Sequence, residues 1–398
     1  MTVTAPPTPP SVEDIRGALR GVIDPELGDN LIDLGMVRDI RIGGPGKAPG
    51  DVTVTIALTI AGCPLRGQLT DDTTRRVGSV PSVTSVDVVM GEMTGEEKRA
   101  LMERARWKAR ENELITDIPP TARIAAIASG KGGVGKSSVT ANLAAALARR
   151  GFTVGVLDAD VAGYSIPRML GLRGRQVEAK ARPEDPTRPH LYPVERRIGS
   201  GLVKVVSMGS IPGAVEDEAV MFRGLMLNRA VQHFLEDVRW GDLDYLLIDM
   251  PPGTSDIQMG LARMLPRAEM IVVTTPAQAA QKVATRAADM ARRGHLRIVG
   301  VIENMAGFVC DHGTNYPLFG EGGGRRLSKQ IGAPLLGSIP LDPAVAVGGD
   351  SGEPAALRDS GHAAEAFAAI ADSLVAEHMP PIEMAGCTAR LLDLVANA

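Results

Sequence analysis

The stretch from Ser129 to Ser138, SGKGGVGKSS, has the residue types and the spacing of a phosphate-binding loop. Its glycines let backbone N–H groups approach phosphate oxygens, Lys136 supplies positive charge to the β- and γ-phosphates, and Ser137 offers a hydroxyl to Mg²⁺. A second lysine, Lys131, is more than phosphate binding needs. The candidate nucleotide-binding residues are Gly130, Lys131, Gly132, Gly133, Val134, Gly135, Lys136, Ser137 and Ser138.

Acidic residues end two of the predicted strands. The sequence LDAD places Asp158 and Asp160 after one apolar run, and LLIDMPPGTSD places Asp249 after another. A carboxylate at the end of a buried strand, beside a phosphate loop, is positioned to meet Mg²⁺ or its water shell. Each aspartate alone could instead cap a helix. Together with the phosphate loop they predict a magnesium-dependent nucleotide site.

The cysteines are few and widely spaced. Cys63, Cys310 and Cys387 do not form a disulfide framework, which is consistent with a reducing cytoplasm. Cys63 ends an apolar run just before Pro64, where a helix is expected to begin, and a helix N-terminus favours a thiolate. We therefore consider Cys63 as a metal or cluster ligand, with a buried apolar cysteine as the alternative. Cys387 lies in the expected tail and is interpreted as incidental.

The elements that position these residues are predicted from apolar runs. From Arg123 onward, runs of strand length alternate with helical segments at 138–150, 218–238 and 280–293. This pattern predicts an α/β fold with a doubly wound, mainly parallel sheet covered on both faces. Ligands of such sheets bind at the carboxyl ends of the strands, where the loop and the aspartates fall. The polar segment 177–201 is expected to be an insertion loop.

The length of 398 residues suggests two or three domains. We expect a small α+β domain over residues 11–94, with a capped helix from Ser11, a hairpin with a long loop, a second helix and a third strand. A P-loop ATPase domain is expected over 122–378. The remaining segments are predicted as a disordered tail (1–10), a helical linker (95–121) and a C-terminal tail (379–398).

Composition excludes several classes of function. A net charge of -4 and 3% aromatic residues predict no binding to nucleic acid. No apolar run approaches the roughly 18 residues of a membrane span, so no membrane partner is expected. The opening MTVTAPPTPP lacks the basic and apolar regions of a signal peptide, which favours a cytoplasmic protein.

Three motifs together, KGGVGKS, LDAD and DMPPGTSD, resemble the deviant Walker A ATPases, the group that contains MinD, ParA and nitrogenase iron protein. The resemblance implies a homodimer in which Lys131 reaches the partner's ATP. It also implies that Asp160 orients the attacking water and that Asp249 holds the Mg²⁺ shell. Asn304 and Pro340 lie where this family contacts adenine.

Further segments, SIPRMLG, EDEAVMFRGLMLNRAV, VIENM and FGEGGG, are similar to the Mrp-type (ApbC-like) iron–sulfur carrier proteins. The segment DPELGDNLIDLGMV resembles the small domain of iron–sulfur assembly factors. The resemblance implies an ATP-hydrolysing homodimer that transfers iron–sulfur clusters to client apoproteins. It also implies a subunit-bridging cluster held by a C-x-x-C pair from each subunit.

This sequence departs from that pair, because Cys310 matches its first cysteine but Gly313 replaces the second. One cysteine per subunit cannot supply four thiolates. His312 could complete a set of two cysteines and two histidines across the dimer. Alternatively, Cys310 could pair with an external ligand or a client's cysteine, or the cluster site has been lost.

Two other functions remain open at this point. One is a nucleotide-switched, client-binding ATPase without a cluster. The other is a positioning ATPase of the ParA or MinD type, which is disfavoured because the sequence has no evident basic DNA-binding face or membrane-targeting helix.

Overall fold

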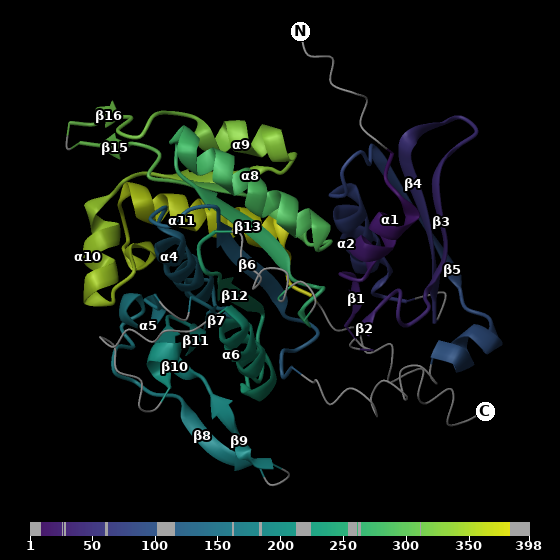
Figure 1. Cartoon of the computed structure of the whole chain (residues 1–398), viewed down its shortest axis with the longest axis horizontal. Helices are drawn as coiled ribbons and strands as arrows, with labels where there is room; N and C mark the ends of the chain where they lie inside the picture. The colour runs from purple at the N-terminus through teal and green to yellow at the C-terminus, as the bar shows by residue number, and fades with distance from the viewer. Residues whose placement is uncertain are drawn as a thin grey trace. The chain divides into compact units, whose positions relative to one another are not determined.

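The computed structural model describes residues 9–25, 27, 29–59, 63–101, 116–160, 163–182, 185–211, 224–253, 261, 264–310 and 312–382. The chain divides into two compact units, one of residues 1–114, 294–297 and 382–398, the other of 115–293 and 298–381. Most of both predicted tails, residues 102–115 of the predicted linker and the start of the helix predicted at 218–238 lie outside the described residues. Figure 1 shows the elements of each unit.

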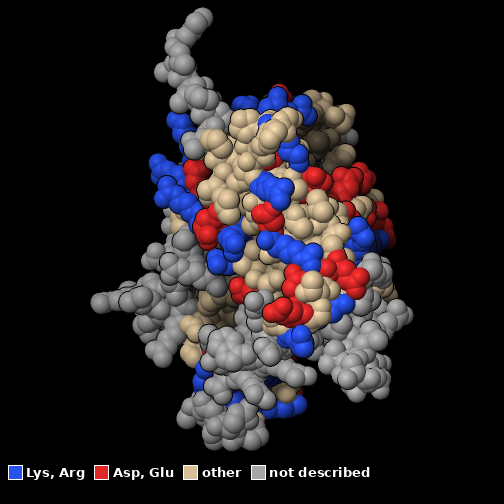
Figure 2. Space-filling model, turned by 90° about the vertical axis from the view of Figure 1, so that its right-hand side faces the viewer, with Lys and Arg blue, Asp and Glu red and all other residues tan. Residues whose placement is uncertain are grey.

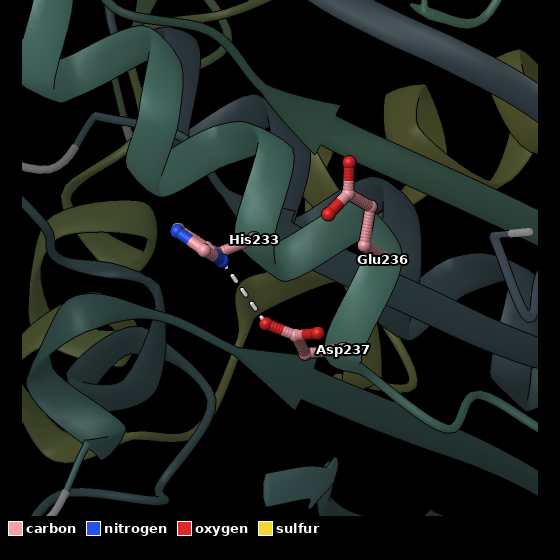
Figure 3. Close-up of side chains that lie close together, drawn as sticks. All are labelled: His233, Glu236 and Asp237. Carbon is pink, nitrogen blue, oxygen red and sulfur yellow. Dashed lines mark hydrogen bonds and ion pairs between the residues drawn. The ribbon is translucent and has the colours of Figure 1, made fainter. Parts of the chain in front are cut away.

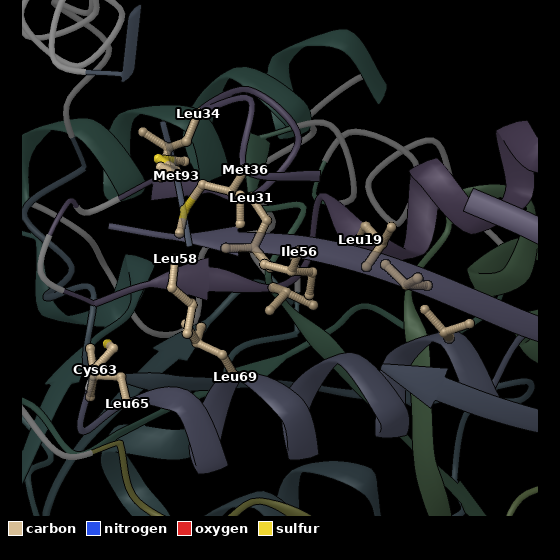
Figure 4. Close-up of a cluster of buried hydrophobic side chains, with 14 of the residues drawn as sticks. Leu19, Leu31, Leu34, Met36, Ile56, Leu58, Cys63, Leu65, Leu69 and Met93 are labelled. Carbon is tan, nitrogen blue, oxygen red and sulfur yellow. The ribbon is translucent and has the colours of Figure 1, made fainter. Parts of the chain in front are cut away.

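The first unit contains a small α+β fold. Its elements are α1 (Val12–Leu19), β1 (Ile23–Asp24), β2 (Asp29–Asn30), β3 (Val37–Gly44), β4 (Lys47–Leu58), α2 (Arg66–Gly78) and β5 (Ser85–Glu92). Helix α1 begins with the predicted capping box, in which Ser11 and Asp14 accept hydrogen bonds from each other's backbone N–H groups. Strand β4 is central, antiparallel to β3 and parallel to β5. Alternate β4 side chains, from Val52 to Leu58, enter the core (Figure 4).

The hairpin of this unit is tighter than the sequence predicted. Gly44 pairs with Lys47, so the connection is the turn Pro45–Gly46 and not a long loop. Gly43, Gly44 and Gly46 all have positive φ, which suits a tight turn at the end of a twisted ribbon. The prediction of a long loop was wrong, because the glycines in this segment supply the positive φ values of a tight turn.

The second unit is built on an eight-stranded sheet in the order β10-β11-β7-β12-β6-β13-β14-β17. Strand β10 is antiparallel to β11, whereas β11, β7, β12, β6 and β13 pair in parallel, as do β14 and β17. The strands are β6 (Arg123–Ser129), β7 (Thr153–Asp158), β10 (Val194–Ile198), β11 (Gly201–Val206), β12 (Tyr245–Asp249), β13 (Glu269–Thr274), β14 (Arg297–Asn304) and β17 (Leu335–Ile339). Strand β6, which leads into the phosphate loop, lies in the interior of the sheet.

Helices cover both faces of this sheet. Helix α4 packs with α11, and α8 packs with α9 on the opposite face (Figure 1). The helices are α4 (Lys136–Arg149), α5 (Ile166–Met169), α6 (Gly224–Asp237), α8 (Gln278–Arg293), α9 (Gly323–Ile331), α10 (Pro343–Ser351) and α11 (His362–Ser373), with short helical turns at Met208–Ser210, Ala355–Leu357 and Leu374–His378. The connection through α4 runs from β6 to β7 toward one edge of the sheet, whereas those through α8 and α9 run from β13 to β14 and on to β17 toward the other edge. Right-handed crossovers in opposite directions place their helices on opposite faces. The predicted doubly wound, mainly parallel fold is confirmed.

The segment 177–201, predicted as an insertion loop, is instead largely β-structure. Strands β8 (Glu178–Arg182) and β9 (Asp185–Tyr192) form an antiparallel ribbon, and β10 extends the main sheet. The prediction was wrong because a ribbon with polar side chains on both faces lacks the apolar alternation that marks a strand in sequence. Its stabilising partners are residues far along the chain.

The end of the second unit is fixed to the sheet. Met379 is buried, its carbonyl accepts a hydrogen bond from the Tyr245 hydroxyl at 2.9 Å, and the Pro380 carbonyl accepts one from Arg123 at 2.7 Å. These contacts extend the unit into the first residues of the predicted tail. Among the described helices, none combines the length and the apolar character that crossing a bilayer requires.

Candidate nucleotide and iron–sulfur site

The phosphate loop connects β6 to α4 and depends on glycine at defined positions. Gly133 and Gly135 have φ of 80° and 82°, in the left-handed region, and Gly135 is the N-cap of α4. Gly130 serves a different purpose, since a Cβ there would overlap the backbone of Val283 and Ala284 in α8. The loop is thus pressed against α8 on one side while its N–H groups lie at a helix N-terminus, which favours an anion.

Lys136 and Asp249 form a buried ion pair at the centre of this site. The Lys136 Nζ lies 2.7 Å from Asp249 Oδ1, and the two side chains are 6% and 0% exposed. The Ser137 hydroxyl donates to Asp249 Oδ2 at 2.6 Å. The residues predicted for phosphate and Mg²⁺ are therefore brought together across 112 positions of sequence. Their oxygen ligands, a hydroxyl and a carboxylate, are of the kind that Mg²⁺ prefers.

Sequence reasoning missed one residue of this group. The Thr140 hydroxyl lies 2.9 Å from Asp249 Oδ1, and the side chain is fully buried. Thr140 lies one helical turn after Lys136, in a stretch that reads as an ordinary helix interior. The spacing between Lys136 and Thr140 is the only feature of the sequence that could have indicated that Thr140 belongs to this site.

Asp158 lies level with Asp249 in the neighbouring strand. Burial, and next the charge of Asp249, raise the pKa of Asp158 to about 7. Its carboxylate accepts hydrogen bonds from the N–H groups of Ser165 and Ile166 at 3.1 and 3.3 Å. Asp158 therefore anchors the start of α5.

Asp160, the residue predicted to orient water, is half-buried at the same edge of the sheet. Burial raises its pKa, Lys136 opposes that effect, and Asp249 adds to it. Residues 161 and 162, which follow it, lie outside the described part of the chain. Its position at the carboxyl end of β7 is compatible with the predicted role.

The two ends of the loop differ in exposure. Lys131, Gly132 and Gly133 are exposed, whereas Val134 and Lys136 are buried, and Ser137 and Ser138 are intermediate. Lys131 is thus exposed to solvent, whereas Lys136 is buried within its own protomer. An exposed cation beside a phosphate loop is available to a second molecule.

Asn304 supports the loop from the end of β14. Its Nδ2 donates to the Val134 carbonyl at 2.9 Å, and a Cβ on Gly135 would overlap this amide. Asn304 is buried and Pro340 is intermediate. Their predicted contacts with adenine stay predictions, while the hydrogen bond gives Asn304 a structural contact with the loop.

Cys310 lies between β15 (Phe308–Val309) and β16 (Asn315–Tyr316), which pair as a small antiparallel ribbon. Its N–H donates to the Thr314 carbonyl at 3.0 Å. Backbone hydrogen bonds, first from His312 and then from Thr314, lower the pKa of the Cys310 thiol. This arrangement favours a thiolate, the form that binds metal.

A cavity of about 430 Å³ adjoins this cysteine, and its lining includes Cys310, Gly313, Pro340, Arg358 and His362. Gly313 has φ of 79°, and a Cβ built on it would meet open space. The position at which the resemblance predicted a second cysteine therefore faces room for another ligand.

The other proposed cluster ligands are His312 and Cys63. His312 is exposed, and in the described part of the protomer no group of three His, Cys, Asp or Glu side chains at ligand distance includes Cys310 or His312. Cys63 belongs to the core of the first unit and is 8% exposed (Figure 4). Helix α2 begins at Arg66, three residues after it. Their roles as ligands stay predictions.

One such group does occur among the described residues, on α6: His233, Glu236 and Asp237 (Figure 3). Arg188 of β9 already occupies it, with Nη2 lying 2.6 Å from Glu236 Oε2 and 2.8 Å from Asp237 Oδ1. Because a guanidinium neutralises these carboxylates and would repel a cation, we interpret the cluster as an ion-pair network. It attaches the β8–β9 ribbon to α6.

The surface charge is mixed where it can be seen. Figure 2 shows one face of the molecule, on which basic and acidic side chains are interspersed among the described residues. The chain has 43 Lys and Arg against 47 Asp and Glu. A mixed surface of this kind creates little long-range field of a single sign on that face.

Comparison with known proteins identifies both units. Residues 120–375 match the family described as NUBPL iron-transfer P-loop NTPase, and residues 12–88 match the family described as iron-sulfur cluster assembly protein. The iron-sulfur cluster carrier protein of Mycobacterium tuberculosis (strain ATCC 25618 / H37Rv) is 47% identical over 352 residues, covering 86% of this chain and 87% of that protein. The carrier protein of the same name from Synechocystis sp. is 39% identical over 359 residues, covering 89% and 94%.

A solved structure supports the fold assignment. The nucleotide-binding protein of Archaeoglobus fulgidus in complex with ADP is 34% identical and matches with a TM-score of 0.51, covering 62% of this chain and 92% of its own. The family match, the relatives and this structure confirm the resemblance predicted from the motifs. The chain therefore belongs to the NUBPL iron-transfer P-loop NTPases and carries an iron–sulfur cluster assembly domain in residues 12–88.

Proposed function

We propose that this protein is a homodimeric, Mg²⁺-dependent ATPase that binds iron–sulfur clusters and transfers them to apoproteins. The observation that carries the ATPase part is the buried group of Lys136, Ser137 and Asp249 at the phosphate loop. The cluster-transfer part is supported by the relatives named iron-sulfur cluster carrier proteins.

The site is arranged to exchange partners when nucleotide enters. In the structure, Lys136 pairs with Asp249 at 2.7 Å. Lys136 would hold the β- and γ-phosphates of a bound nucleotide, and Asp249 and Ser137 would hold Mg²⁺ and its waters. A Mg²⁺ ion held there would neutralise part of the phosphate charge. Asp160 orients the attacking water from the edge of β7.

Lys131 gives this hydrolysis its dependence on assembly. Its exposed side chain lies beside the loop, whereas Lys136 serves the phosphates of its own protomer. A cation supplied by a partner stabilises the negative charge that spreads over the transferring phosphoryl group, as an arginine finger does. Turnover is then limited to the dimer.

The cluster is cargo, and Cys310 is the residue proposed to hold it. Its lowered pKa favours the thiolate form in a partly exposed loop, and the open space at Gly313 leaves room for a further ligand from outside the protomer. A cluster held by one thiolate per subunit needs further ligands, which an exogenous thiol or a client's cysteine can supply. Incomplete ligation by the carrier favours release to a client.

The test is anaerobic reconstitution with iron and sulfide, followed by gel filtration, iron and sulfide quantification and visible spectra. Wild type, Cys310→Ala and His312→Ala are compared, with Cys387→Ala as a control that removes a cysteine elsewhere. We expect Cys310→Ala alone among the cysteine variants to lose the cluster. Each protein is also reconstituted with and without an added small thiol, and retention only with the thiol identifies an external ligand.

Three results would contradict parts of this proposal. Equal iron in Cys310→Ala and wild type would exclude Cys310 as the ligand. Loss of iron in His312→Ala would favour the mixed cysteine–histidine set. Absence of a cluster in wild type under every condition would favour a nucleotide-switched client-binding ATPase that has lost the cluster.

A further inference from the structure

Thr140 makes a contact that its position in a helix does not require. A threonine inside a helix commonly donates to the carbonyl four residues earlier. Thr140 has that acceptor, the Lys136 carbonyl at 3.0 Å, but its hydroxyl also lies 2.9 Å from Asp249 Oδ1. The second acceptor is a carboxylate at the end of β12, so the hydroxyl links the first turn of α4 to the sheet.

Among the residues that the structure describes, Lys136, Ser137 and Thr140 offer side-chain donors to Asp249, and the first two have another task. On the function proposed above, Lys136 turns to the phosphates and the Ser137 hydroxyl turns to the metal. The Thr140 hydroxyl is fully buried one turn further along α4, so its other possible acceptor is the Lys136 carbonyl of its own helix and neither the phosphates nor the metal. With nucleotide bound, Thr140 would be the donor of the three that still faces the carboxylate.

Asp249 needs a remaining hydrogen-bond donor, because its carboxylate is buried and lies beside a second carboxylate. Its side chain is 0% exposed, so water does not replace a lost partner. Asp158 lies level with Asp249 in the neighbouring strand. The two carboxylates repel each other when both are charged. A hydrogen bond from a fixed hydroxyl opposes both the burial and the repulsion.

We propose that Thr140 is a positioning residue, which holds the Asp249 carboxylate toward the metal after Lys136 and Ser137 have left it. This inference rests on the proposed Mg²⁺–ATP site and adds to it a residue that does not touch the nucleotide. Its signature is specific: removing the hydroxyl weakens the magnesium-dependent part of nucleotide binding and leaves the magnesium-free part unchanged.

The experiment measures ATP binding by calorimetry with Mg²⁺ and with EDTA, so that no step depends on hydrolysis. The variants are Thr140→Val, which keeps the shape, Thr140→Ala, which removes bulk, and Thr140→Ser, which keeps the hydroxyl. Thr70→Val is the matched control, because the Thr70 hydroxyl donates to the Arg66 carbonyl at 2.8 Å in α2 without contacting a carboxylate.

We expect Thr140→Val and Thr140→Ala to weaken binding about tenfold with Mg²⁺, as for one hydrogen bond to a charged group. Binding in EDTA should be unchanged, and Thr140→Ser and Thr70→Val should match wild type throughout.

Equal Mg²⁺ enhancement in all proteins would overturn the inference. So would a loss in EDTA as large as the loss with Mg²⁺, since that marks a structural effect. If wild type itself gains nothing from Mg²⁺, the proposed magnesium site fails instead.

Discussion

Asp158 and Asp249 end neighbouring strands at the same level, with Lys136 as their nearby cation. Ion pairing keeps Asp249 with Lys136, while Asp158 is satisfied by backbone N–H groups and by the Ser207 hydroxyl. At the residue scale this site buries two aspartates, Asp158 and Asp249, beside one lysine, Lys136. Such crowding suits a site that receives cations with its ligand.

The raised pKa of Asp158 predicts a pH dependence of stability. Its pKa is about 7 in the folded protein, against about 3.9 in an unfolded chain. Between these values the folded state binds more protons than the unfolded state, so the free energy of unfolding falls as pH rises toward and through 7. Asp158→Asn should remove that component of the fall.

The measurement is urea unfolding in EDTA, from about pH 5.5 to about pH 8, a range that brackets the folded pKa of Asp158. Histidines also titrate there, so the difference between wild type and Asp158→Asn is the quantity of interest. Parallel pH profiles for the two proteins would show that Asp158 does not titrate in this range.

At the scale of elements, the phosphate loop is positioned by two helices and a strand. Helix α4 begins at Lys136, α8 packs against Gly130, and β14 sends the Asn304 amide to the Val134 carbonyl. Glu303, beside Asn304, accepts hydrogen bonds from the Gly324 N–H at the start of α9 and from the Ser338 hydroxyl of β17. The end of β14 therefore fixes both the phosphate loop and the base of the segment that contains Cys310.

Two glycines of the loop should respond differently to alanine. At Gly130 the new Cβ meets helix backbone, which cannot move away by a side-chain rotation. We expect Gly130→Ala to lower the free energy of unfolding by about 3 kcal/mol or more. At Gly133 the Cβ meets open space, and only the positive φ is penalised, at about 1–2 kcal/mol.

Denaturant unfolding of both variants beside wild type checks this order. A thermal scan with ADP present and absent then separates loss of stability from loss of ligand binding. Equal losses in the two variants would mean that α8 yields to the extra methyl group, and that the close packing at Gly130 is not a constraint.

At the scale of the whole molecule, the two lysines of the loop predict different phenotypes. Lys136→Ala should abolish nucleotide binding, because the phosphates lose their main counter-charge. Lys131→Ala should bind ATP nearly as wild type but lose hydrolysis, because a cation supplied by the partner acts mainly in the transition state. We expect a loss of turnover of about 10³-fold or more, in the range of other cations supplied in trans.

Calorimetry measures binding, phosphate release measures turnover, and sedimentation with a slowly hydrolysed ATP analogue measures dimerisation. Wild-type turnover per protomer should rise with protein concentration as the dimer forms. Undiminished turnover of Lys131→Ala, or turnover independent of concentration, would contradict a dimer-gated mechanism.

The sequence alone determined the features that depend on neighbouring residues. The phosphate loop is contiguous, the capping box spans Ser11 to Asp14, and apolar runs separated by helical segments suffice to predict a covered parallel sheet. The sequence also indicated Cys310 as a candidate cluster ligand and showed Gly313 in place of a second cysteine. Each of these follows from local spacing, since main-chain conformation and periodicity are set over a few residues.

Only the tertiary structure decided which distant groups meet. Strand order placed Asp249 beside both Asp158 and the first turn of α4, which brought Thr140 into the site and left Cys63 in a separate core. The β8–β9 ribbon was missed for the same reason, because its arginines pair with carboxylates of α6 about 50 residues away. Long-range pairings depend on how strands are ordered and how close helices pack, and no local pattern in the chain encodes those distances.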